Sequence, residues 1–222
     1  MVDVIAEFMA WSCVVVGLAF LFDWEGRGVG QRAFGVAASG FRVVWAWAIY
    51  LAVPELRPGL FVFIWLEIAM GFLGGLNSLV CVDVDRRPVA WAIPCLYFLS
   101  AFIVPVGGVG RGGDSLLLLS ALPRLIALWY LGAGFTSGVS SFYRLVDRGP
   151  YALVRHPLEL SGVIARGVFL ALNPSLINVV GYGAFCGVAV LCVLVEEGYL
   201  SKFANWRTYS DRVRWRLFPG VW

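Results

Sequence analysis

The chain has 222 residues, of which 60% are hydrophobic and 14% are charged, and its formal net charge is +3. A soluble core of this length cannot bury so much apolar surface, and one lysine among seventeen basic residues leaves no tract suited to nucleic acid. The composition therefore excludes a soluble domain and a nucleic-acid-binding protein, and it predicts an integral membrane protein.

Apolar runs of helical length recur along the chain, without the ten-residue alternation of an outer-membrane barrel, so the expected fold class is all-α. At about 20 residues per span, the sequence predicts seven transmembrane helices near 4–22, 33–53, 59–82, 89–109, 115–137, 158–172 and 175–196. We expect residues 1–137 to form an N-terminal bundle of five spans. Residues 138–222 would form a second unit, made of a loop, a helical hairpin and a tail.

The basic residues between the spans predict the orientation, because positive loop residues favour the cytoplasmic side. Two of these residues, Arg57 and Arg111, fall on one face. Twelve fall on the other: Arg27, Arg32, Arg86, Arg87, Arg144, Arg148, Arg155, Lys202, Arg207, Arg212, Arg214 and Arg216. The 138–157 loop and the tail are therefore expected in the cytoplasm and the N-terminus on the opposite side.

The last two spans form the expected hairpin. The span at 158–172 would be only about 22 Å long, and Asn173–Pro174 joins it to the next because proline cannot continue a helix. The GxxxG pair Gly183 and Gly187 in the second helix suggests a close helix contact. The loop before the hairpin and the end of its second helix must then be neighbours.

These neighbouring ends carry the polar residues of the C-terminal half. The sequence Gly-Pro-Tyr-x-x-x-Arg-His-Pro at 149–157 precedes the hairpin and contains His156, the single histidine of the chain. The pair Glu196-Glu197 follows the hairpin. Acids at a helix C-terminus oppose the helix dipole. We therefore expect Arg155, His156, an arginine of the tail or a cationic ligand to compensate them. Within the first helix, Glu159 and Arg166 are seven residues apart and share a face.

The order of these elements resembles the isoprenylcysteine carboxyl methyltransferase and phospholipid methyltransferase superfamily. The elements are the 149–157 motif, the hairpin, and Glu196-Glu197 followed by Leu200 and Phe203. The resemblance covers about residues 140–222 and includes the tail residues Trp206, Tyr209, Val213 and Pro219. It implies a membrane methyltransferase that uses S-adenosyl-L-methionine in a cytoplasm-facing pocket under the tail. A lipophilic, isoprenoid-like or phospholipid-like substrate would enter from the bilayer.

The residues that correspond to the family's cofactor loop and paired acids are Tyr151, Arg155, His156, Pro157, Glu196 and Glu197. The chemistry of the cofactor adds Trp206 and Tyr209 as aromatic cover for adenine. The candidate catalytic residues are Arg166 for an acidic substrate group, and His156 or Glu159 as a base if the nucleophile is an amine or hydroxyl. No metal site is expected.

Two other functions remain open. Sterol-reductase-type membrane proteins resemble this C-terminal architecture but use NADPH. A non-catalytic scaffold or sensor is the second alternative, because Glu159 and Ser161 stand where the family usually has an aromatic residue and a glycine. The substrate, the choice among O-, N- and S-methylation, and the oligomeric state also remain open. The expected location is a bacterial cytoplasmic membrane.

Overall fold

The computed structural model describes residues 113–132 and 145–222, with short stretches at 61–62, 65–66, 69–70, 83–84 and 140–141. The spans expected near 4–22, 33–53 and 89–109 lie outside the described residues, as does most of the span near 59–82. In chain order the described elements are β1 (Asp83–Val84), α5 (Gly113–Leu131), β2 (Ser140–Ser141), η2 (Gly149–Ala152), α6 (Pro157–Leu172), α7 (Leu176–Leu200) and α8 (Ala204–Arg212).

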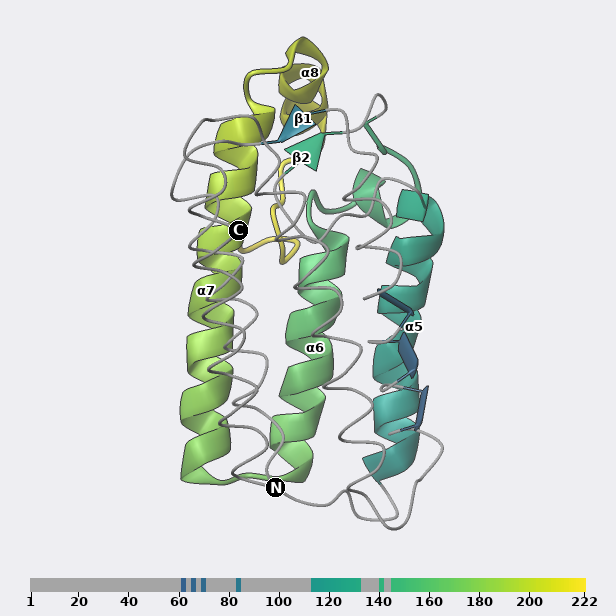
Figure 1. Cartoon of the computed structure of the whole chain (residues 1–222), viewed down its shortest axis with the longest axis vertical. Helices are drawn as coiled ribbons and strands as arrows, with labels where there is room; N and C mark the ends of the chain where they lie inside the picture. Colours follow the sequence, from purple (N-terminus) through teal and green to yellow (C-terminus); the bar gives the residue numbers. More distant parts are fainter. Residues whose placement is uncertain are drawn as a thin grey trace, which may run out of the picture.

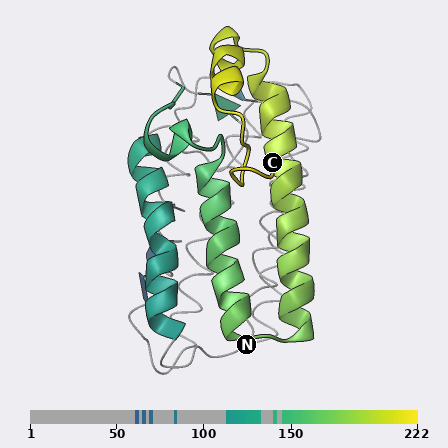
Figure 2. The ribbon, with the colours of Figure 1, turned by 180° about the vertical axis from the view of Figure 1, so that it is seen from behind.

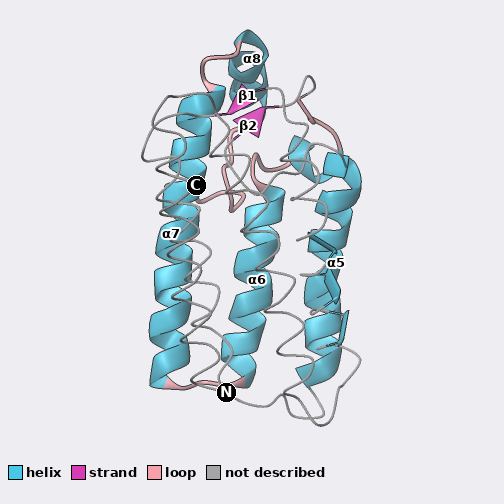
Figure 3. Ribbon diagram, viewed as in Figure 1, coloured by secondary structure: helices cyan, strands magenta, loops and turns pink. Residues whose placement is uncertain are grey.

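Three helices make up most of the described part. Helices α5, α6 and α7 lie side by side with α6 in the middle (Figures 1 and 2), and α8 lies beyond one end of α7. The two-residue strands β1 and β2 pair antiparallel near α8, with Asp83 opposite Ser141. Helix dominates the rest of the described chain (Figure 3), which confirms the all-α expectation for this part.

Helix α5 differs from the expected span at both ends. It begins at Gly113, two residues before the expected start, and ends at Leu131, six residues before the expected end. Gly132 then adopts a positive φ of 52°, a conformation that commonly closes a helix at a glycine. Another glycine with positive φ, Gly149, lies against this helix, and a Cβ there would fall 2.5 Å from the ring of Tyr130. Glycine at 149 therefore lets η2 pack on α5.

The predicted hairpin is present as α6 and α7. Its turn is closed by neutral hydrogen bonds: Ser175 Oγ accepts from the Asn178 backbone N–H at 3.2 Å, and Asn178 Nδ2 donates to the Asn173 carbonyl at 2.9 Å. Helix α7 continues four residues past the expected end at 196, because buried Tyr199 still packs on the ring of Phe203. Glu196 and Glu197 therefore lie in its last turns.

The core of the hairpin lies between the three helices. Leu117 of α5, Val163 and Phe169 of α6, and Phe185 and Ala189 of α7 form one buried apolar cluster. Within the described part of the chain, a Cβ on Gly183 or Gly187 would meet nothing within 4 Å, so the expected glycine seam is not among the helix contacts described. The close approach is instead at Gly167 of α6, where a Cβ would lie 3.0 Å from the Tyr182 hydroxyl of α7.

The outer faces of α5 and α7 are apolar and exposed. They carry Leu116, Leu119, Leu122, Leu125, Ile126 and Trp129 on α5, and Leu176, Ile177, Val179, Val180, Leu191 and Leu194 on α7. Among the described helices, α7 is the one long and apolar enough to cross a membrane, and 28% of its most apolar window is buried. The apolar window of α7 is therefore less covered than the core helix of a soluble protein would be.

Candidate functional site

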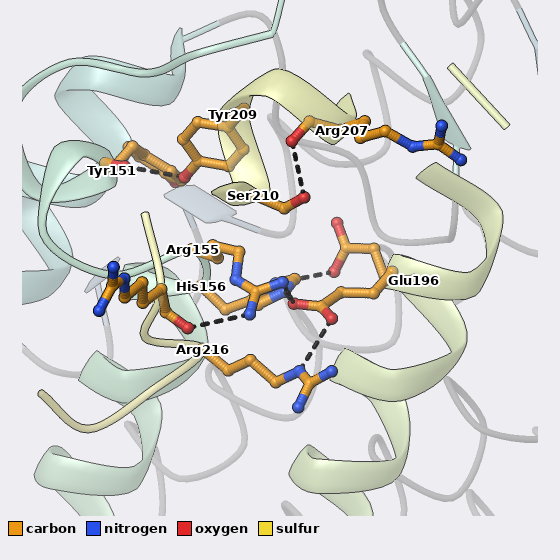
Figure 4. Close-up of polar contacts among 10 residues, drawn as sticks. Tyr151, Arg155, His156, Glu196, Arg207, Tyr209, Ser210 and Arg216 are labelled. Atoms are coloured by element: carbon orange, nitrogen blue, oxygen red, sulfur yellow. Dashed lines mark hydrogen bonds and ion pairs between the residues drawn. The ribbon is translucent and has the colours of Figure 1, made fainter. Parts of the chain in front are cut away.

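The polar residues of the C-terminal half meet at the end of the hairpin opposite its turn, which we call the site end (Figure 4). The loop 145–156, the last turns of α7, and the chain from α8 to Trp222 converge there. Helix α8 packs through buried Trp206 and Tyr209, which join Val213 in a small apolar cluster. Segments up to about 60 residues apart thus build one site.

His156 lies between the two acids of α7. Its Nε2 is 3.2 Å from Glu197 Oε1, and its Nδ1 is 3.4 Å from Glu196 Oε2. Burial alone would lower the pKa of His156, but hydrogen bonds and charge from Glu196 and Glu197 outweigh it and raise the pKa to about 9. With a carboxylate facing each ring nitrogen, His156 is an imidazolium that donates on both sides at neutral pH.

Glu197 also accepts from two arginines. Arg155 Nη1 lies 2.9 Å from its Oε1, and Arg216 Nε lies 2.8 Å from its Oε2. The Glu197 side chain is 10% exposed, whereas the neighbouring Glu196 side chain is 40% exposed. The adjacent acids therefore occupy different environments, one enclosed by cations and one partly open.

Hydrogen bonds of the main chain hold the tail against the loop. The backbone N–H groups of Arg155 and His156 donate to the carbonyls of Trp215 at 2.8 Å and Arg216 at 3.0 Å. Arg155 Nη2 also donates to the Arg214 carbonyl at 3.0 Å. These bonds fix the positions of Arg155 and Arg216 relative to Glu197.

Aromatic side chains line the α8 side of the cluster. The Trp206 ring centroid is 6.3 Å from that of His156 and 5.3 Å from that of Tyr209. Tyr209 Oη donates to the Tyr151 carbonyl at 2.8 Å. Burial, with the negative charges of Glu196 and Glu159 nearby, raises the pKa of Tyr151 and keeps its hydroxyl protonated. Tyr151 Oη and Arg155 Nε are buried donors without a hydrogen-bond partner in the described part of the chain.

The remaining candidates lie along α6. Pro157 is its first residue and is buried, and Glu159 lies in its first turn. Arg166 is ten residues beyond His156, about 15 Å along the helix. Its guanidinium is buried 4.0 Å from the centroid of the Phe185 ring, and its Nη1 lies 3.5 Å from the Gly162 carbonyl. Arg166 is therefore well separated from the cluster around His156.

Arg216 is the site residue that the motifs do not single out. A tail arginine is expected to compensate the acids, but the tail offers four: Arg207, Arg212, Arg214 and Arg216. The structure selects Arg216, because Val213 and Leu217 are buried and set the register of the segment between them. The sequence carries no signal that distinguishes Arg216 from the other tail arginines, because the buried positions Val213 and Leu217 are known only from the packing.

No protein-family model matches this chain, and the curated proteins give no significant match.

Proposed function

We propose that this chain is an integral membrane methyltransferase that uses S-adenosyl-L-methionine to methylate a lipophilic substrate entering from the bilayer. The observation that carries the proposal is the meeting of the Arg-His-Pro motif, the paired acids and the tail aromatics at one end of an apolar helical hairpin. These are the elements on which the resemblance to the isoprenylcysteine carboxyl and phospholipid methyltransferases rests.

The groups at the site end fit the chemical parts of this cofactor. Its sulfonium and amino groups are cationic, and the partly exposed Glu196 carboxylate is suited to bind a cation. Its carboxylate needs donors, and Arg155 Nε and Tyr151 Oη are buried donors available nearby. Trp206 and Tyr209 can cover the adenine.

The cofactor supplies the electrophilic methyl group, and the chain's own residues would bind, orient and exclude water. His156 donates from both ring nitrogens and so has no lone pair with which to take a proton. We therefore assign it an orienting role. A nucleophile that must lose a proton would depend on Glu159, in the first turn of α6.

Calorimetric titration of the detergent-purified chain with S-adenosylhomocysteine tests the cofactor. Glu196→Gln should weaken binding by about tenfold, the loss expected for one charge-assisted hydrogen bond. Asp211→Asn removes a carboxylate from exposed α8 and should bind as the wild type does. Wild-type binding of NADPH in place of S-adenosylhomocysteine would instead support a reductase, and binding of neither would support a scaffold.

We assign Arg166 the binding of an acidic group on the substrate, since a carboxylate- or phosphate-bearing lipid entering sideways needs a cation within the hairpin. Arg166→Met should then retain cofactor affinity and melting temperature while methyl transfer to membrane-lipid extracts falls. Unchanged transfer with a lower melting temperature would reject this role and leave Arg166 as a structural partner of α7.

We also propose seven spans, with the site end in the cytoplasm and the N-terminus outside. The support is the distribution of loop arginines and the exposed apolar faces of α5 and α7. Single cysteines at Ser210 and Asp114, in a variant without the five native cysteines, can be labelled with an impermeant reagent on intact cells. Labelling at 114 and protection at 210 are expected, and the reverse pattern would refute the topology.

A further inference from the structure

The two adjacent acids of α7 have different roles in the cluster. Glu197 uses both carboxylate oxygens: Oε1 accepts from Arg155 and His156 at 2.9 and 3.2 Å, and Oε2 accepts from Arg216 at 2.8 Å. Glu196 faces His156 Nδ1 at 3.4 Å, and its side chain is 40% exposed. Of the two, Glu196 retains the free capacity to meet a ligand.

Arg216 connects three segments. Its carbonyl accepts the backbone N–H of His156 at 3.0 Å, so the residue is fixed to the loop before α6. Its side chain reaches Glu197 on α7. Its guanidinium carbon also lies 5.1 Å from the centroid of the Trp222 ring, which restricts the orientation of the guanidinium. Arg216 therefore joins the tail to the loop through its carbonyl and to α7 through the Glu197 carboxylate.

We propose that Arg216 is a positioning residue of the methyltransferase site. It holds Glu197 Oε2, so that Glu197 stays engaged with Arg155 and His156 while Glu196 faces the cationic ligand. Figure 4 labels Arg155, His156, Glu196 and Arg216 at this end of the hairpin. This inference rests on the proposed function. Without the Arg216 guanidinium, Glu197 is free to turn, and it competes with Glu196 for His156 and for the ligand. The tail also loses the bond from its Arg216 side chain to α7.

Because His156 is the only histidine, its ring proton signals in an NMR pH titration report the cluster without any cofactor. Arg216→Gln removes a cation that competes for Glu197, so the pKa of His156 should rise further above its wild-type value. General loosening of the tail would instead move it down, toward the ordinary value near 6.5. Arg214→Gln is the matched control: its exposed side chain lies two residues away, and only its carbonyl contacts Arg155. It should leave the His156 titration unchanged.

Calorimetry with S-adenosylhomocysteine then tests the positioning role. Arg216→Gln should weaken binding by about tenfold, as for the loss of one charge-assisted hydrogen bond. Arg216→Lys should recover most of the loss, and Arg214→Gln should bind as the wild type does. If the wild type binds and Arg216→Gln matches Arg214→Gln, the positioning role is wrong although the proposed function stands. If the wild type does not bind S-adenosylhomocysteine, the proposed function fails. In the NMR titration, an unshifted or lowered His156 pKa in Arg216→Gln would separately refute the linkage through Glu197.

Discussion

The two ends of the α6–α7 hairpin are held together in contrasting ways. At the turn end, Asn173, Ser175 and Asn178 close the connection with neutral hydrogen bonds inside six residues of chain. At the site end, α6 and α7 are joined by charges: His156, Glu196 and Glu197, with Arg216 contributed from a distant segment. The same pair of helices is thus stabilised locally at one end and by long-range ion pairs at the other.

This difference bears on function. At the turn end, the connecting chain and neutral hydrogen bonds join the two helices. Buried ion pairs cost desolvation that their attraction often only offsets, so stability alone is a weak reason to build them. Glu197 nevertheless lies buried among three cations. The charge at the site end exceeds what packing requires, which supports a binding role there and a purely structural role at the turn.

The largest expected effect follows from removing the central carboxylate. Glu197→Gln leaves Arg155, His156 and Arg216 without their shared anion, so we expect a loss of about 3–5 kcal/mol in unfolding free energy. Glu196→Gln is the matched control, since its partly exposed side chain contacts only His156 among the described ion pairs and should cost far less. Thermal unfolding in detergent measures both, and equal losses would erase the distinction between the two acids.

The second effect is a dependence of stability on pH. The pKa of His156 is raised from 6.5 to about 9 on folding, so its stabilising contribution is complete below about pH 6.5 and is lost as the pH rises through about 9. The shift corresponds to about 3 kcal/mol. The melting temperature should therefore fall between pH 6.5 and 9, and His156→Gln should show a flatter profile. Parallel profiles for the two proteins would mean that His156 is not charged in the fold.

The two ends also differ in how much of them the sequence predicts. The turn is local, so Asn173–Pro174 and the lengths of the flanking apolar runs predict it directly. That His156 and Glu196 are neighbours follows from the antiparallel path of a hairpin. The choice of Arg216 does not, because it depends on the packing of Val213 and Leu217, which periodicity cannot place. The contact of Arg166 with Phe185 likewise depends on the rotation of α6 against α7.

At the turn end the expected effects are smaller and confined to stability. Asn178 is fully buried and its Nδ2 donates to the Asn173 carbonyl, so Asn178→Ala should lower the unfolding free energy by about 1–2 kcal/mol. The affinity for S-adenosylhomocysteine should stay at the wild-type value, because the turn lies at the far end of α6, about 24 Å away. A variant with normal stability and weakened binding would show that the turn shapes the site.

The smallest effect concerns the helix cap at Ser175, and it tests whether the two ends act independently. Ser175 Oγ accepts the Asn178 backbone N–H, so Ser175→Ala should cost about 1 kcal/mol, whereas Ser175→Asp keeps an acceptor next to the α7 N-terminus and should cost less. Each variant can be compared by its melting temperature and by the NMR titration of His156. Because the cap bonds only to its own helix, the pKa of His156 should be the same in all three proteins. A His156 pKa that followed the melting temperature across this series would show that the charged cluster responds to the distant turn, and the two ends would then have to be treated as one cooperative unit.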